Sequence, residues 1–394
     1  MITLLSEPDV QSDIGLLRQA WEGRDTFAFL PAKSGVDRQW IEQGLASLPE
    51  ELRTGHYVLL TSGTTGAPKL IIGRRERSER LAAVLHQLQE SEPVEETILA
   101  LPLPYSYAFV NQWLWSYCHR RALRLTSGLS DPAELGEVLQ QSRNGMICLV
   151  GVQVPLLASY FSGRAFPGII RVHFAGGRFP QEQVPAVQTL FPNATIFNNY
   201  GCAEALPRLT LRKASDAPTA PEIGRPLPGI ELSANDANEL LFRSPYRAVG
   251  IVEAGQFNRL EDETWFKSGD LAEPTEHGAW RLLGRASEVF KRHGEKISLA
   301  TLMHTVTGTW NGQAVFYRER DPGGEEGHVL VLAPEPAADQ LREILLAFRQ
   351  RHGRAQWPLR IESVAALPLL PNGKPDVQQA AKMKNKNLLW HQRI

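Results

Sequence analysis

The sequence contains little cysteine, with Cys118, Cys148 and Cys202 as its three examples in 394 residues. Cysteines this few and scattered do not form a disulfide framework or a cysteine-rich metal site, so we expect a reducing, cytoplasmic environment. The sequence also has no excess of charge of one sign, because its 42 lysines and arginines nearly balance its 43 aspartates and glutamates, giving a formal net charge of -1. Without a bulk positive field, we expect no nucleic-acid partner and no attraction to an anionic membrane.

No apolar run is long enough to predict a membrane helix. The most apolar segment, residues 146–161, is interrupted by Gln153 and Pro155 and falls short of the roughly 20 residues that a span needs. It is better interpreted as a buried strand leading into a helix. The first residues carry early acidic side chains and no basic stretch before an apolar run, so no secretory signal is visible. The ten histidines lack metal-type spacing and no G-x-S-x-G elbow occurs, which disfavours zinc and serine hydrolases.

The pattern of apolar runs predicts an α/β protein with two parts. Apolar runs separated by helical patterns predict a layered α/β domain with a largely buried sheet. The apolar runs are residues 56–60, 97–103, 146–150 and 169–174. We also expect a helix at 77–88 and a loop at 224–229. After Gly284, short alternating strands and one amphipathic helix, at 314–317, 328–332 and 338–352, predict a small α+β domain. We therefore expect a large domain over residues 1–284 and a small domain over residues 285–394.

A loop rich in hydroxyl groups and glycine follows the first of these runs. Its nine positions contain four hydroxyls, two glycines and a lysine, from Thr61, Ser62, Gly63, Thr64, Thr65, Gly66 and Lys69. Glycines let backbone N–H groups converge on an anion, hydroxyls donate further hydrogen bonds and lysine adds a positive charge, a combination that suits a polyphosphate. The loop is not of the Walker form, because no G-K-[ST] is present. The alternative is a loop that merely turns the chain.

The loop resembles the phosphate-binding signature of the AMP-forming adenylating enzymes, a family that includes acyl- and aryl-CoA synthetases, peptide-synthetase adenylation domains and luciferases. Other elements that resemble this family follow in the family's order. They are Ala175-Gly176-Gly177, Asn199-Tyr200-Gly201-Cys202-Ala203-Glu204, Trp265 to Asp270, Gly284 to Gly294, and Leu367 to Lys374. The resemblance extends from about Tyr57 to Asp376 and implies the family's fold, a large α/β domain and a small domain on a hinge.

The resemblance also implies where ATP and Mg²⁺ bind. ATP would contact the hydroxyl-rich loop and a second set of residues, Gly176, Gly177, Asn199, Tyr200 and Gly201. Glu204 would hold Mg²⁺ on the ATP phosphates, which suits a hard cation that prefers carboxylate and phosphate oxygens. Asp270 and Arg285 would hold the ribose.

Three further residues receive catalytic or hinge roles from the same resemblance. Lys374 would stabilise the transition state of adenylation, since a cation aimed at developing negative charge is worth roughly 2.7–4 kcal/mol. Rotation about the hinge residue Ser287 would then replace Lys374 with the loop of Lys291 for the second half-reaction. Ala203, Ser287 and Leu370 depart from the family's usual threonine, aspartate and threonine.

The segment before Thr61 is shorter than in most of the family, so we expect a reduced N-terminal region. Its loss would expose a surface of the large domain that a second copy of the chain could cover.

The acid pocket is expected at Tyr105, Tyr107, Phe109, Phe174 and Ala175. Peptide-synthetase domains place an aspartate at the Tyr105 position to pair with an α-amine, so an α-amino acid is disfavoured. We favour an aryl acid slightly over other acyl acids as the substrate. The alternative is that these aromatic residues only pack in the core and line no pocket.

The basic run Arg74, Arg75, Arg77 and Arg80 is interpreted as a solvated helix face rather than a site for CoA phosphate or a carrier protein.

These features predict an ATP- and Mg²⁺-dependent enzyme that converts a small carboxylic acid to an acyl-adenylate and then transfers the acyl group to CoA. Two alternatives stay open. One passes the adenylate to the phosphopantetheine of an acyl carrier protein, or to an amine, in secondary metabolism. The other is a non-catalytic nucleotide-binding protein on a decayed adenylating scaffold.

Overall fold

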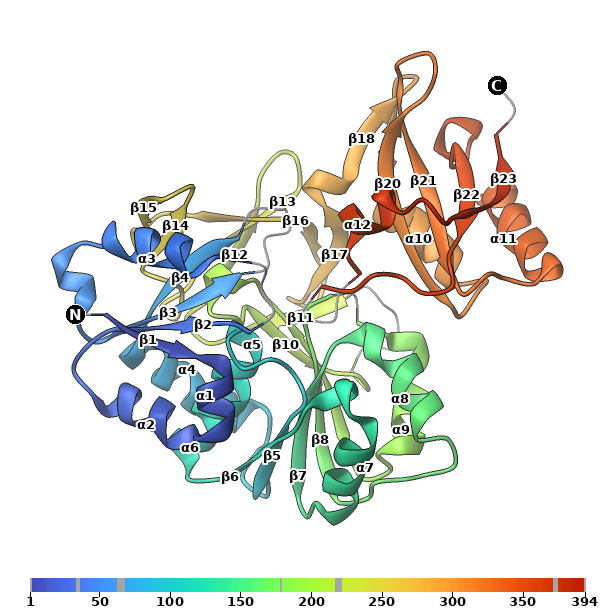
Figure 1. Ribbon diagram of the computed structural model, residues 1–394. Helices are drawn as coiled ribbons and strands as arrows, with labels where there is room; N and C mark the ends of the chain where they lie inside the picture. Colours follow the sequence, from blue (N-terminus) through green and yellow to red (C-terminus); the bar gives the residue numbers. More distant parts are fainter. Residues whose placement is uncertain are drawn as a thin grey trace. The chain divides into compact units, whose positions relative to one another are not determined.

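The computed structural model describes residues 2–32, 36–61, 68–177, 179–216, 222–370 and 375–392 (Figure 1). The chain forms two compact units. The first consists of Met1–Ser233, Leu241–Phe266 and Pro274–Arg281, and the second of Ala234–Leu240, Lys267–Glu273 and Leu282–Ile394. The first unit is a layered α/β structure and the second is a small α+β structure, so the predicted fold class is confirmed.

One sheet of the first unit has the strand order β1-β2-β3-β4-β14-β15. Its strands are β1 (Thr3–Ser6), β2 (Phe27–Leu30), β3 (His56–Thr61), β4 (Lys69–Arg74), β14 (Gly250–Glu253) and β15 (Gln256–Arg259). Side chains alternate along β3, so Tyr57 and Leu59 join one hydrophobic cluster while Val58 and Leu60 join another with helix α3 (Arg38–Ala46). Both faces of this sheet are therefore covered, which explains the unbroken apolar run at 56–60.

The larger sheet of the first unit contains, in order, β11 (Glu222–Pro226), β10 (Thr210–Lys213), β9 (Thr195–Tyr200), β8 (Ile169–Phe174), β7 (Gly145–Leu149), β5 (Glu96–Leu99) and β6 (Ala122–Leu125). Strands β9, β8, β7, β5 and β6 are parallel neighbours. Four further strands continue the order beyond β11, and each is divided between the two units: β17 (Trp280–Arg285), β16 (Phe266–Pro274), β13 (Glu239–Arg243) and β12 (Glu231–Ala234).

Helices cover both faces of the parallel strands. On one face α7 (Pro132–Gln141), α8 (Val154–Tyr160) and α9 (Val184–Leu190) pack on Ile147 and Val172. The opposite hydrophobic cluster contains residues of α1 (Glu7–Ser12), α2 (Ile14–Glu22), α4 (Arg75–Leu88), α5 (Ser106–Ala108) and the π-helix η2 (Phe109–Leu114), which continues into α6 (Trp115–His119). Short 3-10 turns connect these elements at Glu50–Arg53, Gly128–Ser130, Gly151–Gln153, Gln181–Gln183 and Ala203–Ala205.

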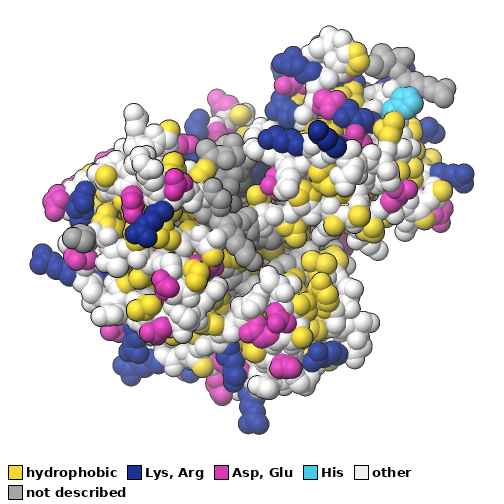
Figure 2. Space-filling view, in the orientation of Figure 1, with side chains coloured by type: hydrophobic (Ala, Val, Ile, Leu, Met, Phe, Trp, Pro, Cys, Tyr) yellow, Lys and Arg dark blue, Asp and Glu magenta, His cyan; other side chains and the backbone are white. Residues whose placement is uncertain are grey.

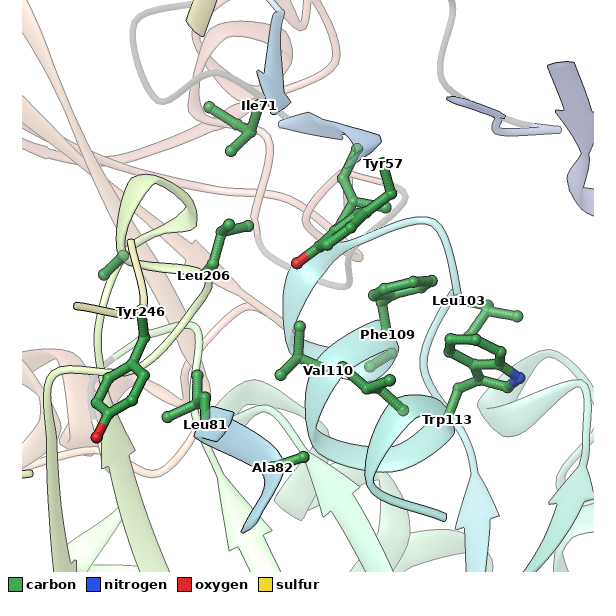
Figure 3. Packing of buried hydrophobic residues seen from close by; sticks show 14 of the residues in the cluster. Tyr57, Ile71, Leu81, Ala82, Leu103, Phe109, Val110, Trp113, Leu206 and Tyr246 are labelled. Carbon is green, nitrogen blue, oxygen red and sulfur yellow. The ribbon is translucent and has the colours of Figure 1, made fainter. Parts of the chain in front are cut away.

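Phe109 lies at the centre of an aromatic cluster in the first unit (Figure 3). Its ring centroid is 5.0 Å from that of Tyr57, 4.9 Å from that of Trp113 and 5.8 Å from that of Trp21. Tyr57 keeps its polar end satisfied through a 2.6 Å hydrogen bond with the Ser78 hydroxyl. Phe109 and Trp113 thus belong to the core, and the partly exposed Tyr107 packs against it.

The prediction that the basic run is a solvated helix face is wrong for two of its residues. Arg75 is buried, donates to the backbone carbonyls of Gly23 and Asp25, and lies over the Trp21 ring. Arg77 forms a two-point ion pair with Asp262, at 2.8 and 2.6 Å. These arginines therefore link segments that are 50 or more residues apart in sequence. On the face of the first unit in Figure 2, acidic and basic side chains are interspersed.

The second unit contains the hairpin β18 (Val289–Arg292) and β19 (Glu295–Ser298), and a sheet of order β20-β21-β22-β23. That sheet is formed by β20 (Gln313–Arg320), β21 (Glu326–Ala333), β22 (Arg360–Ser363) and β23 (Asn387–His391). Alternation along β21 sends Leu330 and Leu332 toward α10 (Leu299–Thr307) and α11 (Ala338–Arg351), whereas Val329 and Val331 share a cluster with α12 (Val377–Lys382). The turns Ala286–Glu288 and Arg354–Gln356 are 3-10 helices.

Strand β11 corrects one local prediction, because residues 224–226 of the expected loop are in this strand. Gly224 has φ +93°, and a Cβ there would lie 2.4 Å from the Leu211 carbonyl oxygen, so the close approach of β10 requires glycine. Within the described ranges, no helix combines the length and apolar character that a membrane crossing needs.

Candidate functional site

The two ends of the hydroxyl-rich loop are fixed by strand pairing. Thr61 and Lys69 are register partners at the ends of antiparallel β3 and β4, and the Lys69 backbone N–H donates to the Thr61 hydroxyl at 3.3 Å. The Lys69 ammonium forms a 3.1 Å ion pair with Glu253 on β14. The rest of the predicted phosphate-binding set, Ser62, Gly63, Thr64, Thr65 and Gly66, lies outside the described residues. Binding of a phosphate by Lys69 would have to compete with Glu253.

The predicted nucleotide residues follow two neighbouring parallel strands. Gly176 and Gly177 come just after β8, and Asn199 and Tyr200 end β9. The carboxyl ends of parallel strands meet at one edge of a sheet, which is where ligands bind in open α/β folds. Gly201 is required by packing, since a Cβ there would lie 1.9 Å from the Pro207 carbonyl oxygen. The structure therefore brings these five predicted residues to one sheet edge.

Glu204 lies at the same edge, in the short 3-10 turn Ala203–Ala205 that follows β9. Its backbone carbonyl accepts a hydrogen bond from Ala248 N–H, which fixes the turn. Its partly exposed carboxylate has no hydrogen bond or ion pair with the described part of the chain. Among the described residues no group of three or more His, Cys, Asp and Glu could hold a metal by itself. A single free carboxylate fits Mg²⁺, which proteins usually hold with one or two carboxylates plus substrate phosphates.

Asp270 and Arg285, the two predicted ribose residues, are an ion pair within the second unit. The Arg285 Nε lies 3.0 Å from Asp270 Oδ1, and the aspartate side chain is 6% exposed against 33% for the arginine. Asp270 is on β16 and Arg285 ends β17, so strand positions 15 residues apart in sequence are joined. Burial raises the pKa of the nearby Glu288 carboxyl, although Arg285 acts in the opposite direction. The positive charge of Arg285 thus acts on two carboxyl groups, those of Asp270 and Glu288.

The residues predicted for hinge motion and catalysis are in the second unit. Ser287 is exposed in the 3-10 turn Ala286–Glu288, and its carbonyl accepts a 3.4 Å hydrogen bond from Arg318. Lys291 is exposed on β18, just before the turn where His293 and Gly294 have φ of +49° and +83°. Lys374 lies outside the described residues. The chain on either side of it is anchored, because Asp376 N–H donates to the Pro368 carbonyl at 2.7 Å.

The predicted acid-pocket residues have different surroundings. Tyr105, Tyr107 and Ala175 are partly exposed, whereas Phe109 and Phe174 are buried in two separate hydrophobic clusters. Burial raises the pKa of Tyr105 to about 12, so its phenol is neutral near pH 7. The packing of Phe109 is that of a core residue, and the alternative of plain core packing describes it better than a pocket wall.

Sequence reasoning missed Arg208, which lies two residues before β10 in a segment with no motif. It is 1% exposed and donates hydrogen bonds to the side-chain oxygens of Asn111 and Asn199. Its guanidinium lies 5.7 Å from the centroid of the Tyr107 ring. A single arginine between apolar residues gives no sequence signal that distinguishes it from a surface arginine.

Comparison with known proteins gives the family. The family model of AMP-binding enzymes matches residues 21–246, more than half of the chain. The chain belongs to the AMP-binding enzyme family. Membership confirms the resemblance to adenylating enzymes and, at the level of the family, an AMP-forming acid ligase that uses ATP.

Individual relatives in this family are distant. The D-alanine–D-alanyl carrier protein ligase of Lacticaseibacillus rhamnosus is 26% identical over 359 residues, which cover 82% of this chain and 69% of that protein. The delta-poly-L-ornithine synthetase of Acinetobacter baumannii (strain AB307-0294) is 25% identical over 349 residues, covering 81% of this chain but 25% of that protein. ATP-bound MatB from Rhodopseudomonas palustris has a TM-score of 0.79 at 13% identity, covering 97% of this chain and 88% of that chain, which shows the shared fold.

Proposed function

We propose that this protein activates a small carboxylic acid with ATP, releasing pyrophosphate, and transfers the acyl group from the resulting acyl-adenylate to the thiol of CoA. The observation that carries this proposal is the Asp270–Arg285 pair, because two residues picked for ribose binding by resemblance alone lie 3.0 Å apart. Family membership and the free carboxylate of Glu204 support it. An aspartate oriented by an arginine is well suited to accept hydrogen bonds from both ribose hydroxyls.

In the first half-reaction a carboxylate oxygen of the acid attacks the α-phosphorus of ATP. A new oxygen–phosphorus bond forms, the bond from that phosphorus to the bridging oxygen breaks, and pyrophosphate leaves. Glu204 would hold Mg²⁺, which offsets charge on the phosphates when bound. The hydroxyl-rich loop positions the phosphates, Asp270 and Arg285 hold the ribose, and Lys374 stabilises the negative charge that develops at the α-phosphate.

In the second half-reaction the thiolate attacks the carbonyl carbon of the adenylate, the carbon–oxygen bond to phosphate breaks and AMP leaves. Rotation of the small domain, residues 285–394, about Ser287 would exchange Lys374 for the Lys291 loop against the large domain, residues 1–284. Ser287 suits a hinge because it is exposed in a short turn. A few residues of this kind can absorb the backbone change of a domain rotation.

The neutral, partly buried Tyr105 supports an acid without an α-amine, because a neutral phenol cannot compensate an ammonium group. An aryl acid is slightly favoured, since Tyr105 and Tyr107 offer partly exposed ring surface. A carrier-protein phosphopantetheine is the second candidate acceptor, supported by the relative whose name specifies a carrier protein. A cytoplasmic location is supported by the absence of any disulfide among the three cysteines, all of which the structure describes.

Mass spectrometry tests the proposal directly. Purified protein is incubated with ATP, Mg²⁺ and pools of aryl and alkyl acids, with either CoA or a phosphopantetheine-loaded carrier protein. The proposal predicts AMP and an acyl-CoA. Acylated carrier protein without acyl-CoA would assign the second acceptor, and ATP binding without AMP from any acid would assign a non-catalytic nucleotide-binding role. Light scattering on the same sample tests the predicted homodimer.

A further inference from the structure

Arg208 is a buried positive charge that no carboxylate compensates within the described residues. Its side chain is 1% exposed, and the acceptors of its hydrogen bonds are the amide oxygens of Asn111 and Asn199, the first at 2.7 Å. Other buried arginines vary in their partners: Arg292 is 3% exposed and lies 3.5 Å from the carboxylate of Asp321, whereas Arg171 donates to backbone carbonyls. A buried ion without an opposite charge is costly, so its retention requires a reason.

The other titratable groups around Arg208 are neutral near pH 7. Burial raises the pKa of the Tyr107 phenol well above its ordinary value and raises that of the Cys148 thiol to about 11. Burial, and then the charge of Arg208, lower the pKa of His173 well below its ordinary value. Burial also lowers the pKa of Arg208, but only to about 10, so its guanidinium remains protonated. The cluster of Tyr107, Asn111, Cys148, His173, Asn199 and Arg208, here the Arg208 cluster, therefore carries a net positive charge.

The Arg208 cluster lies at the ligand-binding edge of the parallel sheet. Cys148, His173 and Asn199 are each the penultimate residue of their strand, on β7, β8 and β9. Cys148 and His173 are register partners. Their strands, β7 and β8, are parallel neighbours (Figure 1). Tyr107 belongs to the predicted acid pocket, and Asn199 to the predicted nucleotide site. Arg208 thus contacts one residue of the predicted acid pocket and one of the predicted nucleotide site.

We infer that Arg208 recognises a second carboxylate on the acid, so that the substrate is a dicarboxylic acid activated at one end and held by Arg208 at the other. This inference rests on the proposed function. A carboxylate fits the guanidinium because planar N–H groups can donate to both of its oxygens. The two asparagines can adapt, since rotation of an amide by half a turn replaces its oxygen acceptor with an NH₂ donor. Asn111 and Asn199 would then donate to the same anion.

The experiment compares a dicarboxylic acid with its own monoamide, which has nearly the same shape but no second charge. Acid-dependent exchange of labelled pyrophosphate into ATP is measured for aryl and alkyl pairs of several lengths. We expect wild-type kcat/KM to be at least about tenfold higher for one or more diacids than for the matched monoamides, because hydrogen bonds between ionic groups are stronger than those to a neutral amide. Arg208→Met should remove this preference, and Arg208→Lys should keep part of it.

Arg171→Met is the matched control. Arg171 is also buried and lies on β8, but its hydrogen bonds go to the backbone carbonyls of Gln89, Glu90 and Ile170. We expect this variant to lose stability while keeping the diacid preference. Thermal unfolding of each variant accompanies the kinetics. If Arg208→Met does not fold, the wild-type preference and its partial retention in Arg208→Lys decide the question.

The outcomes separate this inference from the function on which it rests. Exchange with neutral monoacids at rates equal to or above those with diacids would overturn the role of Arg208 and leave acid activation intact. Equal losses of kcat/KM for diacid and monoamide in both Arg208 variants would show that Arg208 only links Asn111 to Asn199. That result would also overturn the inference that Arg208 recognises a carboxylate of the substrate. Exchange with no acid of either kind would refute the proposed function itself.

Discussion

Asp270 and Arg285 form an ion pair, with Arg285 Nε 3.0 Å from Asp270 Oδ1. The pair joins β16 to the last residue of β17, and the aspartate side chain is 6% exposed. Arginine has no acceptor and an aspartate can accept several hydrogen bonds through its two oxygens, so the pairing with Arg285 orients the carboxylate toward its donors. Ribose hydroxyls are the donors that the family resemblance implies.

Replacing Asp270 by Asn should weaken ATP binding. The variant keeps the shape but replaces hydrogen bonds to a charged group, worth about 1.5–3 kcal/mol, with weaker neutral ones, so the KM for ATP should rise about 10- to 100-fold. Pyrophosphate exchange at varied ATP concentration measures this change. Asp262→Asn is the control, because Asp262 also pairs with an arginine, Arg77, in the first unit. Equal KM values in the two variants would refute the ribose role.

Lys374→Ala and Lys291→Ala should affect opposite halves of the reaction. Loss of an electrostatic stabiliser costs about 10² to 10³ in rate, so Lys374→Ala should abolish acid-dependent pyrophosphate exchange and spare thioester formation from preformed adenylate. Lys291→Ala should keep exchange and slow thioester formation. Both half-reactions are followed by mass spectrometry. Parallel losses in both variants would argue against an exchange of the two lysines by domain rotation.

Phe109→Leu should reduce stability without changing the KM for the acid. The Phe109 ring is 0% exposed and contacts Tyr57, Trp113 and Trp21, so the smaller side chain should cost about 1–3 kcal/mol of unfolding free energy. Denaturant unfolding followed by tryptophan fluorescence gives the cost, and pyrophosphate exchange gives the KM. A raised KM for the acid with unchanged stability would contradict this prediction and would indicate that Phe109 lines the acid pocket.

Glu96→Gln should destabilise the protein in a pH-dependent way. Burial raises the pKa of Glu96, but hydrogen bonds from Ser142, Arg124 and the Arg143 backbone lower it by more, so the net pKa is below its ordinary value. A carboxyl with a depressed pKa in the folded state stabilises the fold above its unfolded value of about 4.3 and loses that contribution as pH falls through the folded pKa.

The difference in unfolding free energy between wild type and Glu96→Gln is therefore expected to be about 1–3 kcal/mol at pH 7 and to shrink below about pH 4.3. Urea unfolding at several pH values measures it. Glu95→Gln is a neighbouring control, because Glu95 is exposed and its carboxylate bonds the Asn144 amide. A difference that is constant with pH, or that grows in acid, would contradict the assignment.

Local patterns were sufficient to predict much of the fold. The apolar run at 169–174 coincides with β8, and the helical pattern at 77–88 lies within α4. These predictions succeed because a strand buried on both faces requires a continuous apolar run, and an amphipathic helix requires apolar residues at helical spacing. The functional roles of Gly176, Gly177, Gly201, Glu204 and Asp270 were assigned by resemblance to the adenylating enzymes, and these roles stay predictions.

Residues whose role depends on distant partners could not be predicted in this way. Arg75 looked solvated, yet its acceptors are the carbonyls of Gly23 and Asp25, 50 or more residues away. Lys69 pairs with Glu253 on a strand that becomes its neighbour only in the folded sheet. Arg208 is buried because β9, β10 and η2 bring Asn199 and Asn111 to it. Periodicity carries no information about such long-range pairing.

Acid-dependent exchange of labelled pyrophosphate into ATP is the measurement that tests acid adenylation most directly, because exchange requires reversible formation of the acyl-adenylate. With Mg²⁺ and a panel of aryl, alkyl and dicarboxylic acids, the wild-type protein should support exchange with at least one acid, and Asp270→Asn should need much more ATP to do so. Tight ATP binding with no exchange for any acid of the panel would contradict acid activation by this protein.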